Sequence, residues 1–164
     1  MADKAMDTYL NDHLAGSTLG ADLAKQIRDN AEAPLRQLME TIAAEIEEDR
    51  ETLIELMDRM GTTKNPVKQA TAWMTEKASR AKFSGVSSGA PDVGKLMALE
   101  SLTLGVTGKE CLWQMLKRVA GRYEALASTD FERLIERARD QHDQLQKERI
   151  KAGMDALAGD QASS

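Results

Sequence analysis

The chain has 164 residues, enough for one domain, or at most two small ones, with a core that needs no disulfide or metal. Its formal net charge is -5, and acidic and basic residues are interleaved along it, which argues against a nucleic-acid-binding surface. Hydrophobic residues make up 41% of the chain and aromatic residues only 4%, a composition that favours helices over strands. We therefore expect an all-α protein with no nucleic-acid partner.

The sequence also bears on the compartment. No apolar run approaches the ~20 residues of a membrane span, and residues 1–7 lack the basic start and apolar core of a signal peptide. Cys111 is the only cysteine, so there is no disulfide framework and no thiolate zinc site. We expect Cys111 to be a small buried apolar residue rather than a reactive thiol. These features predict a cytoplasmic protein with no membrane partner.

The first predicted helix covers about residues 6–30. Its apolar residues recur at helical spacing, and Asn30 is a typical stop. Gly16 and Gly20 lie in its middle, where an interior glycine costs about 1 kcal/mol relative to alanine. We expect another helix to approach closely at these glycines.

The second predicted helix covers about residues 34–61. It begins at Pro34, where the missing amide hydrogen costs nothing, and ends at Gly61, a typical left-handed cap. Midway along it, Glu45 and Asp49 lie on or beside the apolar stripe, at a spacing that places both on one helical face. The short link to the first helix predicts an antiparallel pair.

Residues 62–90 form the longest link in the chain. A short helix fits about residues 66–82, and the Gly/Ser-rich stretch after it is the best candidate for a loop. The alternative is a linker between two domains. We prefer the loop because neither half of the chain has enough helices to close a core, and this favours one domain over residues 1–164.

Two more long helices are predicted, at about residues 91–126 and 130–158. The first of them carries Glu100 on its apolar stripe and Gly105 and Gly108 in its middle. The stripe itself consists of Val93, Leu96, Met97, Leu104, Cys111, Met115 and Val119. A second group of apolar residues widens it: Leu99, Leu102, Val106, Trp113 and Leu116.

The four long helices form two pairs joined by one long excursion. Residues 62–90 are long enough to travel the length of a bundle and return the chain to its starting end, so we expect an up-down-down-up four-helix bundle whose crossover carries the short helix. In that order the glycine-containing helices are neighbours. We then expect Gly105→Leu to destabilise the fold.

Over nearly its whole length the chain resembles the ferritin-like superfamily, in particular its small uncharacterised bacterial branches. The resemblance rests on the helix lengths, the crossover and the acidic residues inside helices. It implies a Glu on the first helix of each pair and a Glu-x-x-His on the second. Glu100 matches this pattern. The second helix instead offers Glu45-Ile-Glu-Glu48 followed by Asp49, and the last offers Asp140-Gln-His-Asp143.

One interpretation of the acidic residues is structural. Glu45, Asp49 and Glu100 then form a polar layer that fixes helix register, satisfied by Arg50, Arg149 or water. The protein is in this case a ferritin-like bundle of unknown role without an intact di-iron centre, non-catalytic and self-associating as a homodimer or larger homo-oligomer. No nucleophile–base arrangement, phosphate loop or cofactor fingerprint is visible, which argues against a hydrolase or a nucleotide-binding protein.

The alternative is a di-metal carboxylate protein. Its candidate ligands are Glu45, Asp49, Glu100, His13 and His142. Carboxylate oxygens with an imidazole nitrogen suit iron or manganese. For a protein of this kind the resemblance implies iron oxidation, iron storage or defence in the oxidative-stress response.

Overall fold

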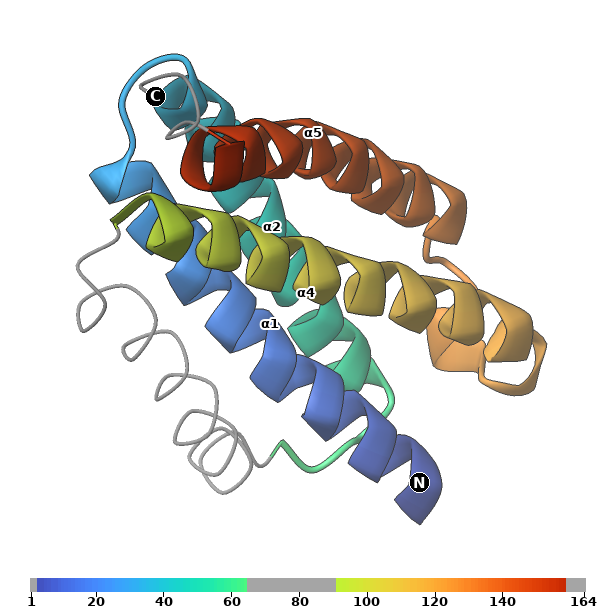
Figure 1. Ribbon diagram of the computed structural model, residues 1–164. Coiled ribbons are helices and arrows are strands. Elements are labelled where there is room, and N and C mark those ends of the chain that lie inside the picture. The colour runs from blue at the N-terminus through green and yellow to red at the C-terminus, as the bar shows by residue number, and fades with distance from the viewer. Residues whose placement is uncertain (1–2, 65–90, 159–164) are drawn as a thin grey trace, which may run out of the picture.

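The computed structural model describes residues 3–64 and 91–158, and every regular element in these ranges is helical (Figure 1). The long helices are α1 (Lys4–Asn30), α2 (Leu35–Arg59), α4 (Pro91–Val119) and α5 (Phe131–Ala158). Two short 3-10 helices, Ala120–Arg122 and Glu124–Leu126, join α4 to α5. The all-α prediction is confirmed for these ranges. The short helix predicted at about residues 66–82 lies outside them.

The long helices begin and end close to the predicted residues, except at the end of α4. The prediction continued this helix to residue 126, but α4 ends at Val119. The backbone of Tyr123 is extended, with φ -131° and ψ 106°, and it separates the two 3-10 turns. Leu126 is fully buried, so this irregular link is anchored in the core. At the end of α2 the prediction is confirmed, because Gly61 has a φ of 66°.

Two buried clusters show the direction in which each helix runs. One cluster joins the C-terminal parts of α1 and α5 to the N-terminal parts of α2 and α4, and the other joins the opposite parts of the same helices. Helices α1 and α5 therefore run in one direction and α2 and α4 in the other. Helix α1 packs beside α2, α4 packs beside α5, and α4 also lies against α1 (Figure 1).

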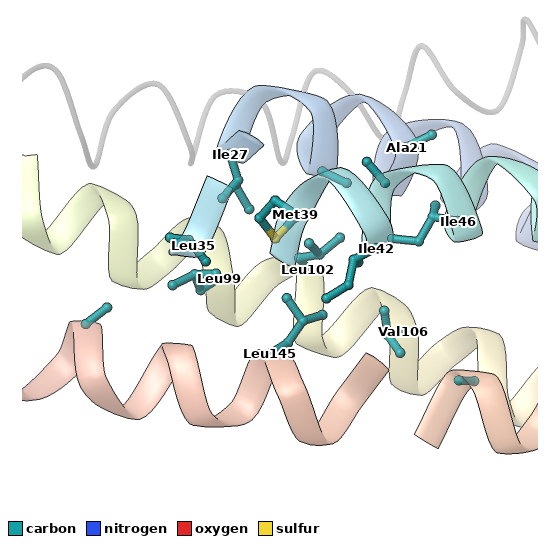
Figure 2. Packing of buried hydrophobic residues seen from close by; sticks show 14 of the residues in the cluster. Ala21, Ile27, Leu35, Met39, Ile42, Ile46, Leu99, Leu102, Val106 and Leu145 are labelled. Carbon is teal, nitrogen blue, oxygen red and sulfur yellow. The ribbon is translucent and has the colours of Figure 1, made fainter. Parts of the chain in front are cut away.

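The first cluster shows how the helices share one interior. Met39 and Ile42 of α2, Leu102 of α4 and Leu145 of α5 lie together between the ribbons (Figure 2). None of these four side chains is more than 1% exposed. Burying such a side chain contributes about 1.5–3 kcal/mol, so residues from three helices stabilise the bundle together.

The core-facing side of α4 differs from the predicted stripe. Met97, Leu104 and Met115 are 40%, 70% and 51% exposed, and Cys111 is exposed. The prediction of a buried Cys111 is therefore wrong. The buried face is the one occupied by Leu96, Leu99, Leu102, Val106, Trp113 and Leu116. Because α4 has apolar residues on two opposite faces, helical periodicity alone does not indicate which of them is buried.

The expected close approach at the glycines is also wrong. A Cβ atom built on Gly16, Gly20, Gly105 or Gly108 meets no atom of the described residues within 4 Å, apart from its own local helix backbone. The small residues of α1 that pack into the core are alanines: Ala15, Ala21 and Ala24. The destabilisation expected for Gly105→Leu therefore loses its physical basis.

Gly105→Ala is expected to raise the free energy of unfolding by about 0.5–1 kcal/mol, because alanine lowers the entropy of the unfolded chain and its methyl group meets open space. Urea unfolding followed by circular dichroism measures this. Gly61→Ala is the matched control: at a φ of 66° the same change is expected to lower stability by about 1–2 kcal/mol. Destabilisation by Gly105→Ala would show that its surroundings are filled.

Candidate functional site

Buried polar side chains cross the bundle between the two hydrophobic clusters. Asp49 of α2 is 1% exposed and Gln141 of α5 is fully buried. Lys109 of α4 reaches both: its Nζ atom lies 2.5 Å from Asp49 Oδ2 and 2.5 Å from Gln141 Oε1. Three helices thus contribute to one hydrogen-bonded group in the interior.

Arg137 of α5 extends this group. It donates one hydrogen bond to Asp49 Oδ1 and another to Glu48 Oε2, the latter at 2.7 Å. Both carboxylate oxygens of Asp49 therefore accept from cations, one on α4 and one on α5. We call Asp49, Lys109, Arg137 and Gln141 the central network.

At its other end the central network reaches Glu45. The Nε2 atom of Gln141 donates to Glu45 Oε2 at 2.8 Å. Glu45 and Asp49 are four residues apart on α2, and Arg137 and Gln141 are four apart on α5, so each pair lies on one helical face. The two pairs meet in antiparallel order. A slip of α5 along α2 by one turn would break both contacts and would form at most one new one, between Arg137 and Glu45 or between Gln141 and Asp49, so the central network favours this register.

The charges of the central network depend on one another. Burial lowers the pKa of Lys109, and the neighbouring Asp49 carboxylate opposes that shift. Burial also acts to lower the pKa of Arg137, but Asp49 and Glu48 outweigh it and the pKa is raised. The side chains of Lys109 and Arg137 are only 13% and 15% exposed. Removing the shared carboxylate would leave two cations with little access to water.

Of the two cations predicted to satisfy Glu45, Asp49 and Glu100, Arg149 pairs with Glu100 and Arg50 pairs with none of them. Arg149 binds Glu100, with 3.0 Å between the guanidinium and the carboxylate, and the Glu100 side chain is 46% exposed. Arg50 binds Glu47 on its own helix at 2.9 Å. A polar layer is present, but its cations are Lys109 and Arg137.

The two candidate histidines contact other groups. The ring of His13 meets Tyr9 edge-on, with 4.6 Å between ring centroids, and burial lowers the pKa of His13 although Asp12 opposes the shift. His142 lies 3.3 Å from the carboxylate of its neighbour Asp143, and its side chain is 38% exposed. Neither histidine has a contact with Asp49 or Glu45 among the hydrogen bonds of residues 3–64 and 91–158.

The structure therefore links two of the five candidate ligands, Glu45 and Asp49, and it does so through Lys109 and Gln141. Glu100, His13 and His142 lie elsewhere. Within the described ranges no group of three or more His, Cys, Asp or Glu side chains is placed to hold a metal ion.

Sequence reasoning missed Lys109, Arg137 and Gln141. A signal existed for Gln141, because it continues the spacing of buried Leu134, Ala138 and Leu145 along α5. The same signal existed for Lys109, because it continues the spacing of buried Leu102, Val106, Trp113 and Leu116 along α4.

Comparisons of this chain with protein-family models, with curated proteins and with solved structures find no match. Among the helices that the structure describes, none combines the length and apolarity required to cross a membrane. The chemistry of the central network is the remaining guide to function.

Proposed function

We propose that this protein is a non-catalytic, ferritin-like helical bundle in which ion pairs stand where a metal centre would lie. The observation that carries the proposal is the pairing of both Asp49 oxygens, with Lys109 Nζ at 2.5 Å on one side and Arg137 on the other. A divalent cation at Asp49 would have to displace these side chains and add positive charge beside them.

The ferritin-like part of the proposal is supported by the helix directions. The chain leaves α2 at one end of the bundle and begins α4 at the other, because the N-terminal parts of α2 and α4 share a cluster. An up-down-down-up order has this property.

A role in assembly is supported by the exposed apolar residues. All six large hydrophobic side chains that are exposed within the described ranges belong to α4 and α5: Met97, Leu104, Met115, Ile150, Met154 and Leu157. Concentrated apolar surface marks sites of protein association. The bundle therefore acts by self-association, as a homodimer or larger homo-oligomer, with the central network holding its helices in register.

Metal analysis separates this function from iron oxidation or storage. The full-length protein is loaded anaerobically with iron(II) or manganese(II), desalted and analysed by plasma mass spectrometry. We expect far less than one ion per chain, in the wild type and in Asp49→Ala/Glu100→Ala alike. Glu100→Ala alone is the control for folding of the double variant, because the Glu100 side chain is 46% exposed and its loss leaves the buried Asp49 in place.

Near-stoichiometric metal in the wild type, lost in the double variant while circular dichroism shows it folded, would overturn the proposal. Metal lost in the Glu100→Ala variant would overturn it equally, even if the double variant failed to fold.

A further inference from the structure

We propose that two copies of this chain pair through α4, antiparallel and about a two-fold axis near residue 106. This deepens the self-association proposed above by naming its surface and register. The surface is the outer face of α4, which we define as Met97, Ser101, Leu104, Gly108, Cys111 and Met115.

The outer face has the spacing of a coiled-coil seam. Its six positions are separated by four, three, four, three and four residues, the alternation that keeps a stripe directed at a partner helix. Leu99, Val106 and Trp113 also repeat every seven residues, but they lie in the core. Helix α4 therefore has one apolar face for the bundle and a second, regularly spaced face that the described residues leave exposed.

The outer face is complementary in size to a second copy of itself. In an antiparallel pair centred at residue 106, Leu104 faces Gly108 of the second copy, Met97 faces Met115, and Ser101 faces Cys111. One alignment produces all three pairings. Leu104 is 70% exposed, and a Cβ atom on Gly108 would meet no atom within 4 Å outside its own local helix, so a large side chain stands opposite open space. Knobs of this kind insert into holes in coiled coils.

The charges at the ends of α4 select the antiparallel direction. Asp92 lies in the first turn, and Lys117 and Arg118 lie in the last. Antiparallel pairing keeps Lys117 and Arg118 of the two copies at opposite ends of the pair, whereas parallel pairing would place the two basic ends side by side. The same alignment opposes the two helix dipoles.

The mass of the full-length protein in solution tests the surface. Analytical ultracentrifugation at high micromolar concentration is expected to give a dimer for the wild type and half that mass for Leu104→Lys, with unchanged circular dichroism. Gln144→Lys is the matched control, because Gln144 is exposed on α5 and lies off the outer face; it is expected to remain dimeric. A monomeric wild type, or a dimeric Leu104→Lys, would overturn the proposal.

Cross-linking tests the register, since Cys111 is the only cysteine. In the proposed alignment the two Cys111 residues are offset by about 15 Å along the helices, too far for a disulfide, whereas Ser101→Cys stands level with Cys111 of the second copy. Mild oxidation is expected to give a covalent dimer for Ser101→Cys and none for the wild type or for Gln114→Cys, another exposed position on α4.

A covalent dimer of the wild type would indicate parallel pairing and contradict the proposed register. A Ser101→Cys protein that is dimeric but does not cross-link would also contradict this register. Metal binding in the earlier test would refute the non-catalytic function without changing these masses, so failures of the two proposals can be told apart.

Discussion

Asp49→Leu is expected to lower the free energy of unfolding by about 3–5 kcal/mol, the cost of breaking a buried ion pair from one side. Leucine nearly matches aspartate in shape, so the space stays filled while the carboxylate shared by Lys109 and Arg137 disappears. Both cations then remain close to the core, 13% and 15% exposed, without their counter-charge. Urea unfolding at neutral pH, followed by circular dichroism, measures the loss.

The control makes the same change at a surface ion pair on the same helix. Glu47 binds Lys25 and Arg50 at 2.9 Å, but its side chain is 31% exposed. Glu47→Leu is expected to lower stability by less than about 1 kcal/mol. Equal losses for Asp49→Leu and Glu47→Leu would mean that Asp49 is not held in a buried network.

The second large effect is a recovery of the free energy of unfolding in a triple variant. Adding Lys109→Met and Arg137→Met to Asp49→Leu is expected to restore about 3 kcal/mol relative to Asp49→Leu alone, because replacing a whole buried ion network by apolar residues is often close to neutral. Met fills the space of the long basic side chains while removing their charge. The recovery stays incomplete, because Gln141 loses the Lys109 ammonium as a hydrogen-bond donor.

The same unfolding experiment measures the triple variant. If it is as unstable as Asp49→Leu, the cost of the single change does not come from stranded cations. Expected alongside the recovery is a less specific packing of α5 on α2, seen as broadened side-chain NMR signals, because the contacts that fix register are gone.

The fold could be predicted largely from local chemistry. Gly61 ended α2 as expected because a positive φ suits glycine, and helical periodicity identified each long helix. The core-facing side of α4 could not be predicted, because Leu104 and Val106 belong to two apolar faces of one helix. Only the positions of α1, α2 and α5 decide between these faces.

The candidate site could also be predicted only in part. Asp49 could be singled out, because a carboxylate on an apolar stripe requires a buried partner. Its pairing with Lys109 and Arg137 could not, because periodicity along one helix gives the face of a side chain and not the residue that it meets on another helix. Arg50 follows Asp49 in sequence but turns to Glu47, whereas Lys109 and Arg137 come from helices that are distant in sequence.

The central claim is that Asp49 is paired inside the bundle with Lys109 and Arg137. The coupling free energy between Asp49 and these two cations tests it most directly. It is obtained from the unfolding of four proteins: the wild type, Asp49→Leu, Lys109→Met/Arg137→Met, and the triple variant. The two sets of changes are expected to be non-additive by more than about 3 kcal/mol, because either set alone strands a buried charge and the triple variant strands none. Changes that add to within ~0.5 kcal/mol would show that these side chains do not interact, and would contradict the central network.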